Sequence, residues 1–143
     1  MHLFHAWAEN FGFPPLFFSV NALVWRALYK IREAIGAIME LIGRALTLSE
    51  LVSYQDGSVV SKTLIDKKIG TVTMFSFGAG QGLSEHTVPY DAFVQVVDGE
   101  AEVVINGEAQ TVSAGQMIIM PANIPHELKA VKPFKMLLVM IRA

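Results

Sequence analysis

The spacing of hydrophobic residues in the first third of the chain is helical. Between residues 22 and 45, apolar side chains recur at alternating steps of three and four, at Leu28, Ile31, Ile35, Ile38 and Ile42. Charged residues of both signs lie elsewhere on the helical wheel, and Asn21 is a suitable N-cap. The pattern predicts an amphipathic helix that packs on a core or on a partner subunit. Contact of residues 16–45 with a membrane surface is the alternative, which the aromatic residues favour and the mixed charges oppose.

After residue 58 the hydrophobic period shortens and the chain becomes strand-like. Runs of β-branched and aromatic residues predict strands at 59–65, 70–77, 93–97, 101–105, 109–112, 116–120, 126–130 and 134–141. The dipeptides Asp98-Gly99 and Asn106-Gly107 favour tight turns and predict two hairpins. The capping-box sequence TLSE at Thr47–Glu50 predicts one short helical turn. Many short strands at close spacing predict a mainly-β sandwich or barrel.

The change of period divides the chain into two parts. Residues 1–45 form an apolar, helical extension, and residues 46–143 form the β domain. Met39 stands just before the second part. An alternative is therefore that synthesis starts at Met39 and that residues 1–38 belong to an over-extended gene model.

The composition of the chain excludes several functional classes of protein. The net charge of −2 gives no basic surface for nucleic acid, and the absence of cysteine excludes disulfides and thiolate sites. No basic segment precedes an apolar one as in a signal peptide, so we expect a cytoplasmic protein. The longest apolar run, residues 16–25, is about half of what a bilayer span needs. Because 52% of residues are hydrophobic, we expect a buried subunit interface, most simply in a homodimer.

Two stretches carry the pattern of greatest interest. Residues 80–99 read GQGLSEHTVPYDAFVQVVDG, and residues 115–126 read GQMIIMPANIPH. Together they resemble the paired motifs of the cupin superfamily, in particular its small single-domain Cupin_2 (conserved barrel) type. The resemblance extends over about residues 46–142. It implies a single jelly-roll barrel, also called a double-stranded β-helix, and agrees with the expectation of a homodimer.

The resemblance also assigns roles to individual positions. In metal-binding cupins the first motif supplies two histidines one residue apart and then a glutamate, and the second motif supplies a third histidine. His86 and His126 match the first and the last of these ligands. Val88 and Ala92 stand at the other two positions and cannot coordinate a metal. Asn123 replaces the usual glycine of the second motif and tolerates the same left-handed backbone.

Two polar residues nearby are candidate substitutes for the lost ligands. Asp91, beside the glutamate position, would complete a site of two histidines and one carboxylate. Alternation along an unbroken strand opposes this, because Asp91 is an odd number of residues from His86, but Pro89 between them can reset the alternation. Gln95 lies in an apolar strand and can reach a ligand or a metal-bound water.

These residues leave several functions open. The first is a non-catalytic or weakly catalytic binding module that holds a small organic molecule, in a pocket made by His86, Val88, Ala92, Val94, Gln95, Val96 and His126. The second is a cupin enzyme of dioxygenase or isomerase type with a divalent metal: iron, manganese, nickel, copper or zinc. The third is an interaction module that uses the N-terminal helix. Purely structural histidines also fit, and the sequence requires no cofactor and identifies no catalytic residue.

Overall fold

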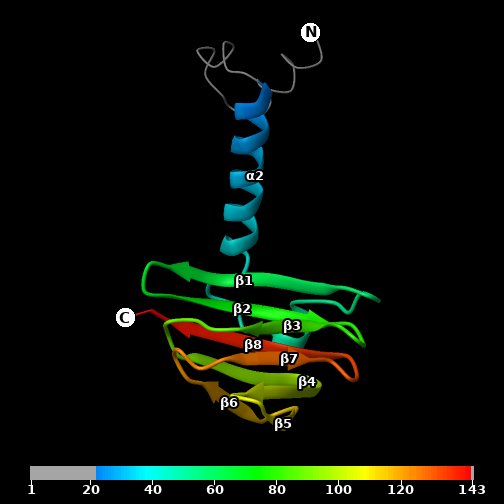
Figure 1. The fold of residues 1–143 in the computed structure, drawn as a ribbon. Helices are drawn as coiled ribbons and strands as arrows, with labels where there is room; N and C mark the ends of the chain where they lie inside the picture. The colour runs from blue at the N-terminus through cyan, green and yellow to red at the C-terminus, as the bar shows by residue number, and fades with distance from the viewer. Residues whose placement is uncertain (1–21, 143) are drawn as a thin grey trace, which may run out of the picture. The chain divides into compact units, whose positions relative to one another are not determined.

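The computed structural model describes residues 22–142, which fall into two units that divide between Ile42 and Gly43. The first described element is helix α2 (Ala22–Met39), shown in Figure 1. The expected N-cap Asn21 and the first part of the expected apolar run, residues 16–20, lie outside the described residues.

Helix α2 is shorter than the spacing of its apolar residues predicts. It ends at Met39, and residues 40–43 form a turn that Gly43 closes with a φ of +74°. Because this left-handed backbone favours glycine, the turn stops the helix before residue 45. The side chains of Leu28, Ile31 and Ile35 are 43–54% exposed, so a partner for this stripe remains a prediction. Within residues 22–142, no helix has the length and hydropathy to cross a membrane.

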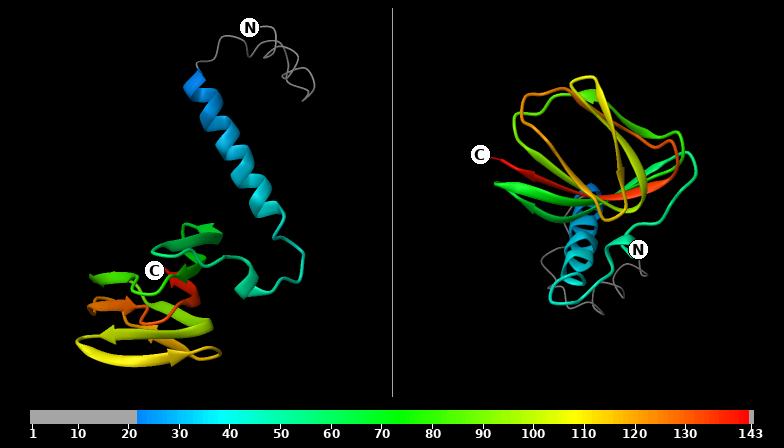
Figure 2. Two further views of the ribbon diagram at one scale, coloured as in Figure 1. Left: turned by 90° about the vertical axis from the view of Figure 1, so that its right-hand side faces the viewer. Right: turned by 90° about the horizontal axis from the view of Figure 1, so that it is seen from below.

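The second unit is built from eight antiparallel strands and one short 3-10 helix. The helix is η2 (Leu48–Glu50), and the strands are β1 (Val59–Lys67), β2 (Gly70–Phe77), β3 (Gly82–His86), β4 (Ala92–Ile105), β5 (Glu108–Ser113), β6 (Met117–Met120), β7 (His126–Lys129) and β8 (Phe134–Ile141). They form two layers, which we call sheet A (β1-β2-β8-β4-β6) and sheet B (β3-β7-β4-β5). The strands curl so that the layers face each other, which confirms a mainly-β jelly-roll barrel (Figure 2).

Strand β4 connects the two sheets, and it corrects one sequence prediction. Its first half pairs with β6 and β8 and its second half with β7 and β5. The predicted hairpin at Asp98-Gly99 is wrong, because β4 continues through these residues with a bulge between Val96 and Asp98. Gly99 has a φ of +72°, and a side chain there would collide with the carbonyl of Pro133. Left-handed backbone of this kind is common in turns. Here it bends the long strand β4 from sheet A into sheet B.

Other local predictions are confirmed. Asn106 and Gly107 both have positive φ, as the turn of the β4–β5 hairpin requires, and Ile105 pairs with Glu108 across it. The TLSE segment forms η2, although the Thr47 side chain makes no capping hydrogen bond. Strand β3 was not among the predicted strands, because GLSEH lacks the β-branched and aromatic residues that mark the others.

The core lies between the two sheets. Phe77 and Phe134 stack at 4.5 Å between ring centroids, and both are fully buried. Alternate residues of β4, namely Ala92, Val94 and Val96, are also buried on the inner face. Burying an aliphatic or aromatic side chain of this kind stabilises the fold by about 1.5–3 kcal/mol. The core therefore fixes which face of β4 points into the barrel.

Candidate functional site

The fold brings His86 and His126 together at the end of sheet B. They are directly paired residues of the antiparallel strands β3 and β7. Their ring centroids are 4.6 Å apart, with an angle of 63° between the ring planes. His126 is buried, at 2% exposed, whereas His86 is exposed to solvent. The pair therefore places one polar side chain inside the barrel and the other next to it at the surface.

Both rings are held in the same way by the backbone. His86 Nδ1 donates a hydrogen bond to the carbonyl of Ser84 at 2.7 Å, and His126 Nδ1 donates to the carbonyl of Ile124 at 2.9 Å. Because a carbonyl oxygen only accepts hydrogen bonds, the proton of each neutral ring lies on Nδ1. Each Nε2 keeps its lone pair, which is available to a ligand or a metal ion.

The two histidines line a small cavity, which we call the histidine cavity. It has a volume of about 30 Å³, and its wall consists of Leu83, His86, Val88, Ala92, Met120, His126, Leu128, Met136, Leu138 and Met140. Four of these ten residues, His86, Val88, Ala92 and His126, belong to the pocket expected from the sequence. The other six are aliphatic or methionine side chains, so the histidines are the cavity's only side chains with nitrogen or oxygen atoms.

The remaining expected site residues lie elsewhere. Val94 and Val96 are fully buried in the core but do not line the cavity. Gln95 points to the opposite side of β4, because it follows Val94 along the strand and pairs with Leu137 and Met117. The strand period therefore separates Gln95 from the two histidines.

Asp91 has a partner of its own. Its Oδ1 accepts a hydrogen bond from the backbone N–H of Ala122 at 2.8 Å. In the same region the N–H of Asn123, which has the expected positive φ of 63°, donates to the carbonyl of Val88 at 2.7 Å. These two bonds join the loop after β3 to the loop before β7. Asp91 thus helps to hold the loop after β3, which carries Val88 of the cavity wall.

Sequence reasoning missed the methionines of the cavity. Met136 and Met140 are on the inner face of β8, in alternation with Leu137 and Val139, and Met120 ends β6. The alternation of β8 was visible in the sequence, but apart from Lys135 both of its faces are apolar. The period alone therefore did not indicate which set points into the barrel.

The cavity does not provide the metal site of a typical cupin. Among residues 22–142, no three or more His, Cys, Asp and Glu side chains lie close enough together to hold a metal ion. The cavity offers two imidazole nitrogens and no carboxylate. Divalent iron, manganese, nickel, copper and zinc ions are held in proteins by three or more nitrogen, oxygen or thiolate ligands. The residues present therefore do not fit the divalent metal that the resemblance implies.

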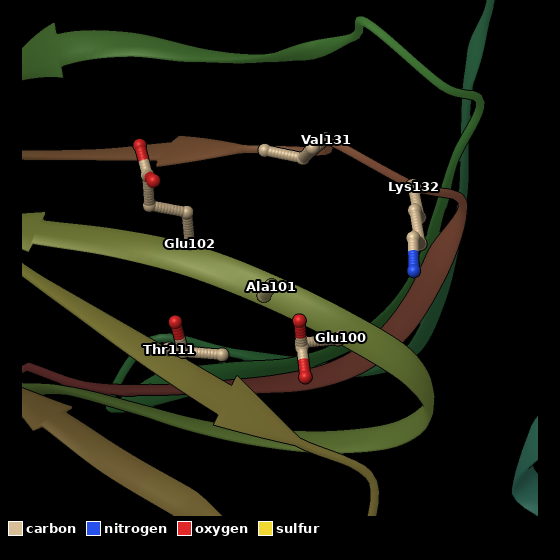
Figure 3. A pocket seen from close by; sticks show the side chains of 6 residues that line it. All are labelled: Glu100, Ala101, Glu102, Thr111, Val131 and Lys132. Carbon is tan, nitrogen blue, oxygen red and sulfur yellow. The ribbon is translucent and has the colours of Figure 1, made fainter.

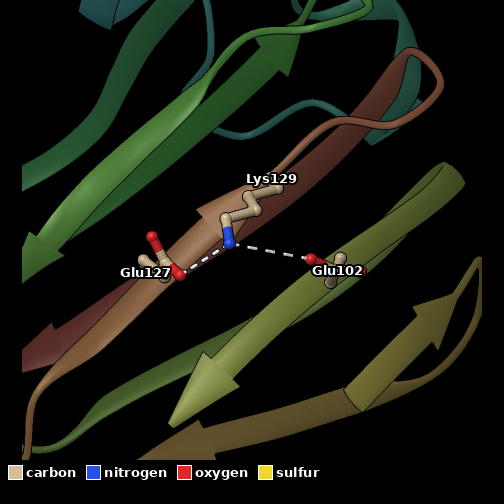
Figure 4. Close-up of polar contacts among 3 residues, drawn as sticks. All are labelled: Glu102, Glu127 and Lys129. Atoms are coloured by element: carbon tan, nitrogen blue, oxygen red, sulfur yellow. Dashed lines mark ion pairs between the residues drawn. The ribbon is translucent and has the colours of Figure 1, made fainter. Parts of the chain in front are cut away.

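A larger hollow of about 110 Å³ lies on the surface of sheet B, lined by Glu100, Ala101, Glu102, Thr111, Val131 and Lys132 (Figure 3). Its carboxylates already have partners. Glu100 accepts a hydrogen bond from the Ser113 hydroxyl, and Glu102 lies 3.9 Å from Lys129 Nζ. Lys129 also pairs with Glu127 at 2.7 Å (Figure 4), and this hydrogen bond raises the pKa of Lys129. These are contacts of a solvated surface, so we take the histidine cavity as the candidate site.

Comparison with known proteins agrees with this architecture. The family model described as the Cupin domain, Cupin_2, matches residues 73–141, whereas no curated protein matches the chain. A conserved protein of unknown function from Streptococcus pyogenes is 39% identical over 71% of this chain and 89% of its own, with a TM-score of 0.68. A cupin 2 conserved barrel domain protein from Leptotrichia buccalis is 41% identical over 68% of this chain and 47% of its own, with a TM-score of 0.66.

A third solved structure, a cupin superfamily protein from Desulfitobacterium hafniense, shares the fold at 24% identity, with a TM-score of 0.68 over 71% of this chain and 93% of its own. The matched segment, residues 73–141, contains both histidines and most of the barrel. The chain therefore belongs to the cupin superfamily, as a protein of the Cupin_2 type.

Proposed function

We propose that this cupin barrel binds a small organic molecule in the histidine cavity and that it does so without catalysis. The supporting observation is the composition of the cavity wall: two histidines with free Nε2 atoms are set among valine, alanine, leucine and methionine. Val88 and Ala92 contribute to this apolar wall at the two positions where metal-binding cupins carry ligands. An apolar cavity with few polar anchors is typical of small-molecule sites.

The geometry limits what the ligand looks like. With a volume of about 30 Å³, the cavity is far smaller than the roughly 300–1,000 Å³ of a typical ligand pocket, so we expect only a short apolar end of a ligand to fit inside. Each neutral imidazole accepts a hydrogen bond at Nε2, so the ligand needs an O–H or N–H group next to that end. The rest of the ligand would extend past His86, which is exposed to solvent.

The lining residues also favour binding over catalysis. The wall contains no serine, threonine, lysine or carboxylate that could act as a nucleophile or as a second acid–base group. In the alternative, a divalent-metal dioxygenase or isomerase, the cavity would supply only two nitrogen ligands to the metal ion. For this reason we rank it second.

A ligand screen on metal-free protein tests the proposal. We expect short alcohols, amines or hydroxy acids to raise the melting temperature of the wild type. His86→Leu removes the exposed anchor, and Val88→Phe fills the cavity while both histidines remain, so each should abolish the shift. Lys67→Leu, at an exposed position at the end of β1 and outside the cavity wall, serves as the matched surface control. A screen without any stabilising ligand, or equal shifts in all variants, contradicts the proposal.

A further inference from the structure

The histidine cavity contains a second kind of donor atom, the thioether sulfur. Three of the seven methionines line it: Met120 from β6, and Met136 and Met140 from β8. Met136 is fully buried and Met120 is 3% exposed, so these sulfurs belong to the interior of the barrel. Together with the two imidazoles, they are the only side chains with donor atoms on the cavity wall.

The strand register places two of these methionines around the position of a lost ligand. Ala92, which stands where the family resemblance expects glutamate, pairs with Met120 on one side and with Met140 on the other. Directly paired residues point to the same face of a sheet, so both methionines flank Ala92 inside the barrel. The alanine side chain is small and offers no donor atom of its own at this position. Soft sulfur donors thus surround the position at which a carboxylate would be expected.

This donor set favours a soft metal ion of low charge. Imidazole binds copper well, and thioethers select Cu(I), whereas carboxylates and water suit harder ions. All the donors are neutral, and the cost of burying an ion in an apolar site rises with the square of its charge. We infer that the histidine cavity binds Cu(I) through Nε2 of His86, Nε2 of His126 and the sulfur of at least one cavity methionine. The inference uses the cavity of the proposed function but does not depend on the organic ligand.

An anaerobic titration of the full-length protein with Cu(I), in competition with a colorimetric Cu(I) chelator, measures this site. The background variant His2→Ala/His5→Ala removes imidazoles that lie outside the described residues. We expect one equivalent of Cu(I), with an affinity that falls at least about tenfold when Met120, Met136 and Met140 are replaced together by leucine. His86→Leu should weaken binding similarly. Met74→Leu is the matched control, because Met74 is equally buried but does not line the cavity.

Labelled methionine methyl groups give a second, independent measurement. On addition of Cu(I), we expect the NMR signal of at least one cavity methionine to shift, while the signals of Met74 and Met117 stay in place. Zn²⁺ should bind more weakly than Cu(I), because the cavity lacks thiolate and carboxylate ligands. The inference is overturned if the leucine variants keep wild-type Cu(I) affinity, if only other methionines respond, or if Zn²⁺ binds more tightly.

The two tests fail separately. A metal-free protein that binds a short organic ligand and ignores Cu(I) rejects the copper site alone. A protein that binds Cu(I) through its methionines but responds to no organic ligand rejects the proposed function alone.

Discussion

Tyr54 illustrates how single residues hold the segment before β1 against the barrel. Its hydroxyl donates to Asp98 Oδ2 at 2.7 Å, and Lys135 Nζ lies 4.7 Å from the centre of its ring. The same Lys135 donates to the carbonyl of Ser49 at 2.6 Å. Partial burial raises the pKa of Tyr54 above its ordinary value of 10.0, and the hydrogen bond to Asp98 and the charge of Asp98 raise it further. The folded barrel therefore holds the phenol proton more tightly than the unfolded chain does.

Replacing Tyr54 by phenylalanine tests this contact, because the ring and its cation remain and only the hydroxyl is lost. We expect the free energy of unfolding at neutral pH to fall by about 0.5–1 kcal/mol, since Tyr54 is partly exposed. A raised pKa in the folded state means that this contribution is fully present below pH 10.0 and declines as the pH rises further. Urea unfolding of both proteins at neutral and alkaline pH measures the difference, and a gap that widens above this pH contradicts the explanation.

At the scale of the element, the bend of β4 is the feature on which the barrel depends. Gly99 combines a positive φ with close contact to the Pro133 carbonyl, where β4 leaves sheet A for sheet B. Gly107, in the β4–β5 turn, has a similar φ of +81° but no atom near the position of a side chain. A side chain at Gly107 would therefore meet backbone strain alone, whereas a side chain at Gly99 would meet both backbone strain and a steric collision.

Gly99→Ala should therefore destabilise the protein more than Gly107→Ala. Left-handed backbone alone costs an alanine about 1–2 kcal/mol, which we expect for Gly107→Ala. The collision with the Pro133 carbonyl should add about 1–3 kcal/mol for Gly99→Ala. Chemical denaturation of both variants measures the two losses. Equal losses would show that the backbone at Pro133 moves aside freely.

At the scale of the whole molecule, the outer face of sheet A carries an apolar patch on β4, β6 and β8. Phe93 pairs with Val139 and Ile119, and all three lie on the side of the sheet opposite to the buried Val94. Ile119 on the edge strand β6 is 53% exposed. The patch formed by these three residues can match the same patch of a second copy about a two-fold axis. This face is our candidate for the expected homodimer interface.

Ile119→Lys should convert a dimer into a monomer, because a charge would be buried in the centre of that interface. Sedimentation equilibrium of the wild type and the variant measures the mass. Ile69→Lys is the control, since Ile69 is 74% exposed in the β1–β2 turn. Ile35→Lys on α2 tests the alternative in which the helix is the interaction module. A monomeric wild type rejects the homodimer, and dissociation by Ile35→Lys alone assigns the contact to the helix.

Local patterns were sufficient for much of the fold. The turn at Asn106-Gly107, the short helix at Leu48–Glu50 and most strands follow from turn chemistry and β-propensity, which act over a few residues. The paired motifs around His86 and His126 also identified the fold family. These features are determined by the sequence itself, because each depends on neighbouring residues or on a short pattern.

Other features required the tertiary structure, because they depend on residues far apart in the chain. Asp98-Gly99 has the chemistry of a hairpin turn, yet pairing with β8 and β7 makes it a bend within one strand. The pairing of His86 with His126, and of Ala92 with Met120 and Met140, was set by strand register. Register decides which donors share a cavity, and no local pattern contains it. The sequence by itself thus determined a cupin barrel with two histidines, whereas the tertiary structure decided that methionines line the same cavity.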